Sequence, residues 1–130
     1  MGALTVQNST LSGNTAGGWG KGGAIMNDTG LWVGIYPKVW RGATATITGC
    51  TITGNTASTG GGISQTSAGG SLTLTNSTIT GNTATLDAGG LYINASAGGT
   101  TYLDACTLAH LANNSAPSNA NSDGPYLTGL

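Results

Sequence analysis

The chain has 130 residues and a formal net charge of −1, and only 5% of its residues are charged. Its three basic residues, Lys21, Lys38 and Arg41, are too few to neutralise phosphates, which excludes ordinary nucleic-acid binding. No apolar run is long enough to span a bilayer, so the sequence predicts no membrane insertion.

A sequence motif of twelve residues occurs three times along the chain, and a shorter fourth copy follows. The copies are TVQNSTLSGNTA (5–16), TITGCTITGNTA (46–57), TLTNSTITGNTA (73–84) and YLDACTLA (102–109). Copies two and three start 27 residues apart (46 to 73), and copies three and four start 29 apart (73 to 102). Repeats of this period predict units that stack on one another to bury a shared apolar face.

Each copy predicts three short strands separated by corners. In the third copy, alternation places Leu72 and Leu74 on the inner face of the first strand, and Ile79 on the inner face of the second. Asn76 and the Gly81-Asn82 pair supply the corners. A third strand follows the glycines at 22–27, 60–65 and 89–94, and its inward residues stay open because the copies align in two registers.

Equivalent strands are expected to pair in parallel, which stacks equivalent side chains into rows. One inward row comprises Val6, Ile47, Leu74 and Leu103, and another comprises Leu11, Ile52, Ile79 and Leu108. A corner row of Asn14, Asn55 and Asn82 predicts an Asn ladder, in which amides bond along the stack. Because parallel crossovers are right-handed, the predicted fold is all-β: a right-handed parallel β-helix, or three-sided β-solenoid, of about four coils.

The predicted organisation is one β-solenoid domain over residues 1–130. Its parts are coil 1 at about 3–45 with a Trp-rich insert at 30–42, coil 2 at about 46–71, coil 3 at about 72–100, coil 4 at about 101–116, and an irregular tail at 117–130. The segment 124–130 also echoes 70–74, which leaves open the start of a fifth coil. The first repeat begins at Ala3, so the sequence predicts no signal peptide.

The run LTLTNSTITGNTA at 72–84, followed by Gly-Gly-Leu-Tyr at 89–92, resembles the pectin-lyase-like β-helix repeats of bacterial surface proteins. These include polymorphic outer-membrane, autotransporter and choice-of-anchor proteins. The resemblance covers roughly residues 3–110. It implies an extracellular or cell-surface setting, and the matching phrase carries no family active site.

The cysteines occupy equivalent positions two layers apart, at Cys50 and Cys106. Two layers of strands span about 9.6 Å, which exceeds the roughly 7 Å limit for a disulfide. Both thiols are therefore expected to be free and to face inward.

Catalytic and metal-binding patterns are weak in this sequence, and no cofactor is expected. The four aspartates fall on different coils, so neither paired carboxylates nor a calcium site is indicated. Asp104, Cys106 and His110 form the one suggestive group, as orienter, nucleophile and base. The alignment places Cys106 in the core, which favours a structural interpretation.

The insert carries Trp32, Tyr36 and Trp40, which are expected to seal their own coil, contact a neighbouring subunit or stack against a sugar. Uncapped solenoid ends expose unpaired strand edges that recruit further strands. The sequence thus predicts a non-catalytic structural protein whose partner is itself, stacked head-to-tail into an extracellular filament or surface layer. The joints are expected near Val6, Leu11, Leu103 and Leu108. The alternatives are a carbohydrate- or ice-binding module, suggested by outward Thr-x-Thr rows, and a polysaccharide-active enzyme.

Overall fold

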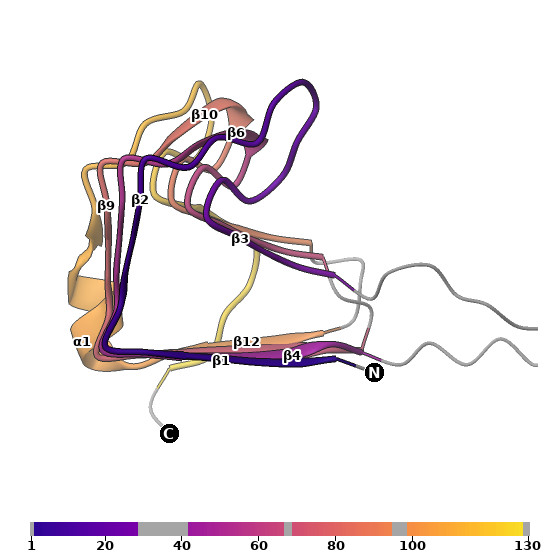
Figure 1. Cartoon of the computed structure of the whole chain (residues 1–130), viewed down its shortest axis with the longest axis vertical. Coiled ribbons are helices and arrows are strands. Elements are labelled where there is room, and N and C mark those ends of the chain that lie inside the picture. Colours follow the sequence, from indigo (N-terminus) through magenta and orange to yellow (C-terminus); the bar gives the residue numbers. More distant parts are fainter. Residues whose placement is uncertain (1, 29–41, 67–68, 95–98, 129–130) are drawn as a thin grey trace, which may run out of the picture.

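The protein is described here by a computed structural model, which covers residues 2–28, 42–66, 69–94 and 99–128. The regular structure of the described residues consists of short β-strands and one five-residue helix, and every strand pairing among them is parallel. Figure 1 shows the strands of each sheet lying one behind another along the direction of view.

Four successive repeats contribute strands to the same set of sheets. The first repeat holds β1 (Ala3–Gln7), β2 (Thr10–Ser12) and β3 (Ile25–Asn27). The second holds β4 (Thr44–Thr48), β5 (Thr51–Thr53), β6 (Thr56–Thr59) and β7 (Ile63–Gln65), and the third holds β8 (Ser71–Thr75), β9 (Thr78–Thr80), β10 (Thr83–Asp87) and β11 (Leu91–Ile93). The fourth holds β12 (Thr100–Leu103), α1 (Ala105–Ala109), β13 (Leu111–Ala112) and β14 (Ser122–Asp123).

The strand order within each sheet follows the repeats. The sheets run β1-β4-β8-β12, β2-β5-β9-β13, β3-β7-β11-β14 and β6-β10. The second and third repeats thus contain four strands each, where the sequence predicts three. The additional strands β6 and β10 directly follow the corner asparagines, where Thr-rich sequence continues in extended conformation.

The predicted inward row of Val6, Ile47, Leu74 and Leu103 is confirmed by the strand register. The second predicted row is correct for Leu11, Ile52 and Ile79, but its fourth member is Leu111. The predicted inward position of Leu108 is wrong, because this residue lies on α1 and is 38% exposed. In the third strands, which the sequence leaves open, Ile25, Ile63 and Leu91 align and are buried.

Helix α1 lies between the first strand (β12) and the second strand (β13) of the fourth repeat, and it changes which side chains reach the interior. The Asp104 carboxylate caps the helix by accepting from the Thr107 backbone N–H at 2.8 Å. Thr107 is fully buried, and its hydroxyl oxygen accepts from the Ser77 backbone N–H. Cys106 therefore lies on the exposed side, which contradicts the inward-facing prediction, whereas Cys50 is buried as expected. Both thiols are free.

One corner of the stack has no room for side chains. A Cβ built on Gly23 would lie 2.2 Å from the Gly61 carbonyl oxygen, and one on Gly61 would lie 2.4 Å from that of Gly89. A Cβ on Gly89 would in turn lie 2.4 Å from the carbonyl oxygen of Ser115. Glycine is therefore required here because consecutive repeats bring their backbones into direct contact.

Candidate functional site

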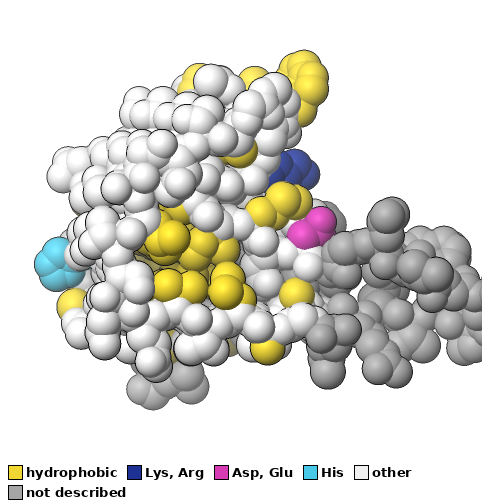
Figure 2. Space-filling view, in the orientation of Figure 1, with side chains coloured by type: hydrophobic (Ala, Val, Ile, Leu, Met, Phe, Trp, Pro, Cys, Tyr) yellow, Lys and Arg dark blue, Asp and Glu magenta, His cyan; other side chains and the backbone are white. Residues whose placement is uncertain are grey.

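The first-repeat end, defined as the outer edges of β1, β2 and β3, exposes apolar side chains. Leu4 is 44% exposed, and Val6, Leu11 and Ala24 pack against the core while remaining partly accessible. Figure 2 shows apolar side chains gathered in the middle of this face, within a largely uncharged surface. β1, β2 and β3 are each the outermost strand of their sheet.

The open edge of β1 carries backbone groups that can accept another strand. Thr44 donates its N–H to the Gly2 carbonyl, and Asn8 donates its N–H to the Thr48 carbonyl, so even-numbered residues of this strand bond to β4. By the alternation of a strand, Ala3, Thr5 and Gln7 point their N–H and C=O groups away from β4. An unpaired edge of this kind is a template for strand addition.

The predicted corner asparagines form a ladder with a single direction. Asn14 donates its backbone N–H and Nδ2 to Asn55 Oδ1, both at 3.0 Å, and Asn55 donates in the same way to Asn82 at 3.0 and 2.9 Å. Asn82 continues the ladder to Asn114, a fourth member that the repeat pattern of the sequence does not predict. The insertion that accommodates α1 places Asn114 32 residues after Asn82, outside the regular spacing.

The two ends of this ladder differ. Among the described residues, no donor reaches Asn14 Oδ1, which is therefore a free acceptor at the first-repeat end. At the other end, Asn114 donates its backbone N–H and Nδ2 to Asn121 Oδ1, at 3.1 and 3.3 Å. The chain thus supplies its own final acceptor in place of a fifth corner asparagine.

The fourth-repeat end, defined as the faces of β12, β13 and β14 turned away from the third repeat, is partly covered by the tail. Leu127 donates its N–H to the Thr101 carbonyl at 2.8 Å, and its carbonyl accepts from Leu103 N–H at 3.0 Å. Leu103 is fully buried, and its predicted place at a joint between copies stays a prediction. The tail, expected to be irregular but with a segment at 124–130 that echoes 70–74, adds β14 and, at Leu127, one strand-like layer on β12. This layer agrees with the alternative in which a fifth coil begins in the tail.

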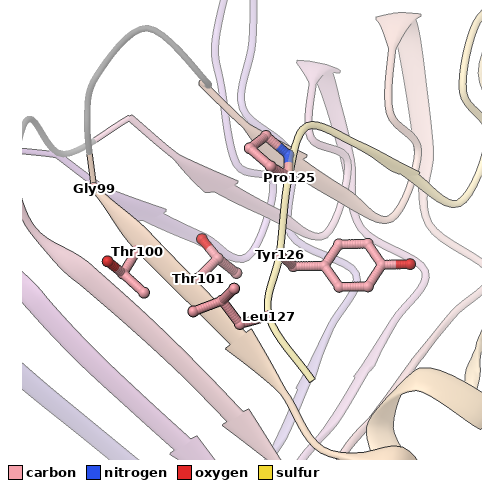
Figure 3. A pocket seen from close by; sticks show the side chains of 6 residues that line it. All are labelled: Gly99, Thr100, Thr101, Pro125, Tyr126 and Leu127. Atoms are coloured by element: carbon pink, nitrogen blue, oxygen red, sulfur yellow. The ribbon is translucent and has the colours of Figure 1, made fainter. Parts of the chain in front are cut away.

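A pocket of about 190 Å³ lies beneath this layer, between residues 99–101 and 125–127. Figure 3 shows the tail segment running beside β12, with the Tyr126 ring directed away from Thr100. The Thr101 hydroxyl is buried beside this pocket and has no hydrogen-bond partner among the described residues. The tail therefore packs imperfectly on β12.

A column of aligned residues at the β6-β10 sheet carries opposite charges at its two ends. Lys21 pairs with Thr59, and Thr59 pairs with Asp87, so the three residues occupy equivalent positions in successive repeats. Asp87 Oδ1 accepts from Asn119 Nδ2 at 3.0 Å. Desolvation, together with a hydrogen bond and like-charge repulsion from Asp87, raises the pKa of Asp123. The aspartates expected to be scattered thus include one adjacent pair, near the fourth-repeat end.

The group Asp104, Cys106 and His110 does not form the predicted nucleophile–base–orienter arrangement. His110 Nδ1 donates to the Cys106 carbonyl at 2.7 Å and lies 3.9 Å from Cys106 Sγ. The Asp104 carboxylate accepts from the backbone N–H groups of Thr107 and Asn76. Its pKa is lowered mainly by hydrogen bonding to the Thr107 side chain and further by these two backbone bonds, against a smaller opposing effect of burial. The carboxylate therefore fixes a corner and a helix, and does not orient the imidazole.

The predicted aromatic contacts Trp32, Tyr36 and Trp40 lie outside the described residues. Within the part of the chain that the structure covers, no helix is long and apolar enough to cross a membrane, and no group of three metal-ligating side chains is found. Comparisons with protein-family models, curated proteins and solved structures gave no significant match.

Proposed function

We propose that the protein is a non-catalytic structural subunit, a right-handed parallel β-helix that stacks head-to-tail with further copies into an extracellular filament or surface layer. The observation that carries this proposal is the complementarity of the two ends. The first-repeat end offers open strand edges, partly exposed apolar rows and a free acceptor on Asn14. At the fourth-repeat end, the same rows finish on β12, β13 and β14.

The driving force for stacking would combine apolar burial with backbone pairing. Leu4, Val6 and Leu11 would lose their remaining contact with water, which contributes about 25 cal/mol per Å² of apolar surface buried. Very low net charge removes the repulsion that keeps many proteins apart. The extracellular setting rests on the resemblance to bacterial surface repeats.

The test is assembly of the purified full chain, measured by sedimentation velocity and negative-stain imaging. Thr5→Pro removes an N–H that points away from β4, so it should block docking while sparing the internal ladder. Thr5→Val keeps that N–H and serves as the matched control. We expect filaments from the wild type and Thr5→Val, and dispersed particles from Thr5→Pro. Filaments from all three would refute docking at β1.

The outward threonines favour a second candidate, an ice- or carbohydrate-binding face. Thr5, Thr46 and Thr73 share one column, and the hydroxyls of Thr48 and Thr75 lie 3.0 Å apart in another. Such regular hydroxyls on parallel strands form a flat, repeating polar surface. The test uses protein that does not assemble. Thermal hysteresis that is present in the wild type and absent in Thr46→Lys would favour the ice-binding candidate. Glycan binding that is lost in the same variant would favour the carbohydrate-binding candidate.

A further inference from the structure

We propose that residues 125–128 act as an internal plug, which occupies the position on β12 that strand β1 of a second copy takes when copies assemble. This inference rests on the proposed head-to-tail stacking and adds a step to it, the displacement of the tail. It is carried by the strand register, the fit of the tail, and the polarity of the two ends.

The register shows why the tail obstructs stacking. The sheets that end at β13 and β14 contain four strands each. The sheet that ends at β12 also contains four strands, and among the described residues it is the one sheet with a fifth layer, added by the bridge between Tyr102 and Leu127. A second copy can continue all of these sheets together only if its β1 lies directly on β12, where the tail now lies.

The tail fits this position only in part. Tyr126 falls in the inward column of Leu72 and packs against the core, but the two residues after it do not match the rows. Leu127 pairs with Tyr102, in the outward column that Thr46 and Thr73 occupy, and is 60% exposed. One residue further along, the exposed Thr128 falls in the column of buried Leu103. Pro125 also fits poorly in a strand, because its backbone has no N–H to donate to a neighbouring strand.

Strand β1 has the pattern that this position requires. By register, Leu4, Thr5 and Val6 occupy the columns that Thr101, Tyr102 and Leu103 occupy in the fourth repeat. A second copy would therefore place Leu4 over Thr101, where Tyr126 now lies, and Val6 over Leu103. Among the described residues, the plug is held by the packing of Tyr126 on the core and by two backbone hydrogen bonds, one donated and one accepted by Leu127. These contacts are few enough for a better-matched strand to replace them.

The polarity of the ends selects the head-to-tail orientation. Asn14 Oδ1 is a free acceptor, whereas the matching donors of Asn114 already bond to Asn121 Oδ1, which Asn14 of the next copy would have to replace. A head-to-head contact would instead set two acceptors against each other. Head-to-tail stacking also brings Lys21 of one copy, in the column of Asp87, toward the acidic pair of the next copy.

The experiment changes the plug in opposite directions within the full chain. Leu127→Pro removes the N–H that bonds to Thr101, while Leu127→Thr retains it and places the usual residue in the outward column. Thr128→Val puts an apolar side chain over Leu103 and should strengthen the plug. We expect Leu127→Pro to lower the protein concentration needed for half-maximal assembly about three- to tenfold, Thr128→Val to raise it, and Leu127→Thr to change it little.

The outcomes separate the plug from the assembly itself. If the wild type assembles and Thr5→Pro blocks it, but Leu127→Pro and Thr128→Val leave the assembly concentration unchanged, the plug is refuted and the stacking stands. If neither the wild type nor Leu127→Pro assembles, both proposals fall. The double variant Thr5→Pro/Leu127→Pro should stay dispersed, and filaments from it would show that the released edge of β12 does not bind β1. Thermal melting of each variant checks that it is folded.

Discussion

Asn82 is the ladder residue whose replacement should destabilise the protein most. Its side chain is fully buried and makes four short hydrogen bonds to neighbouring repeats. Oδ1 accepts from Asn55 N–H and Nδ2 at 3.0 and 2.9 Å, and Nδ2 donates to the Ile52 carbonyl and Asn114 Oδ1 at 2.9 and 3.0 Å. Each bond contributes about 1 kcal/mol net, so Asn82→Ala should cost about 4 kcal/mol.

Asn14→Ala is the matched control, because it removes the same amide from the exposed end of the same ladder. There the side chain makes a single described hydrogen bond, to Asn55 Oδ1, and a cost of about 1 kcal/mol or less is expected. Urea unfolding followed by far-UV circular dichroism measures both free energies. Equal costs for the two variants would refute the view that the ladder stabilises the interior of the stack, since only burial and bond number distinguish them.

Three further predictions concern the carboxylates and thiols. The pKa of Asp104 is lowered on folding, so its contribution to stability should be present above about pH 4 and lost as the pH falls through the folded pKa. Urea unfolding at a series of pH values should show this dependence in the wild type and not in Asp104→Asn. The pKa of Asp123 is raised, so the stability linked to it is present below about pH 4 and lost as pH rises through the folded value. Asp123→Asn should therefore stabilise the protein at pH 7, and a lower melting temperature would contradict the repulsion from Asp87. In a thiol-reagent assay, exposed Cys106 should react at once and buried Cys50 only on unfolding, whereas two equally slow thiols would contradict this placement.

The sequence predicts the interior rows well where the repeat is regular. Val6, Ile47 and Leu74 align because each is fixed by the same alternation and by corners at the same spacing. The fourth repeat breaks this regularity. Residues 104–107 carry a helix signal, because Asp104 is a good N-cap and the residues after it are compatible with a helix. The similarity of this segment to the earlier repeats favours a strand instead.

The features of the fourth-repeat end depend on tertiary register and could not be read from local pattern. Asp87 and Asp123 are 36 residues apart (87 to 123), and they meet only because β14 pairs with β11. Asn121 completes the ladder from a segment with no repeat signature. The direction of the amide bonds likewise follows from the stacking geometry and not from the identity of the asparagines.

The close-packed glycine corner has a consequence for how the molecule tolerates change. Since Gly23, Gly61 and Gly89 lie in line along the stack, any methyl group there would push two layers apart. Sensitivity to substitution should thus form a narrow stripe along one edge, flanked by permissive stripes where threonines face solvent. A mutational map of this protein would look banded lengthwise, unlike the compact sensitive centre of an ordinary globular domain.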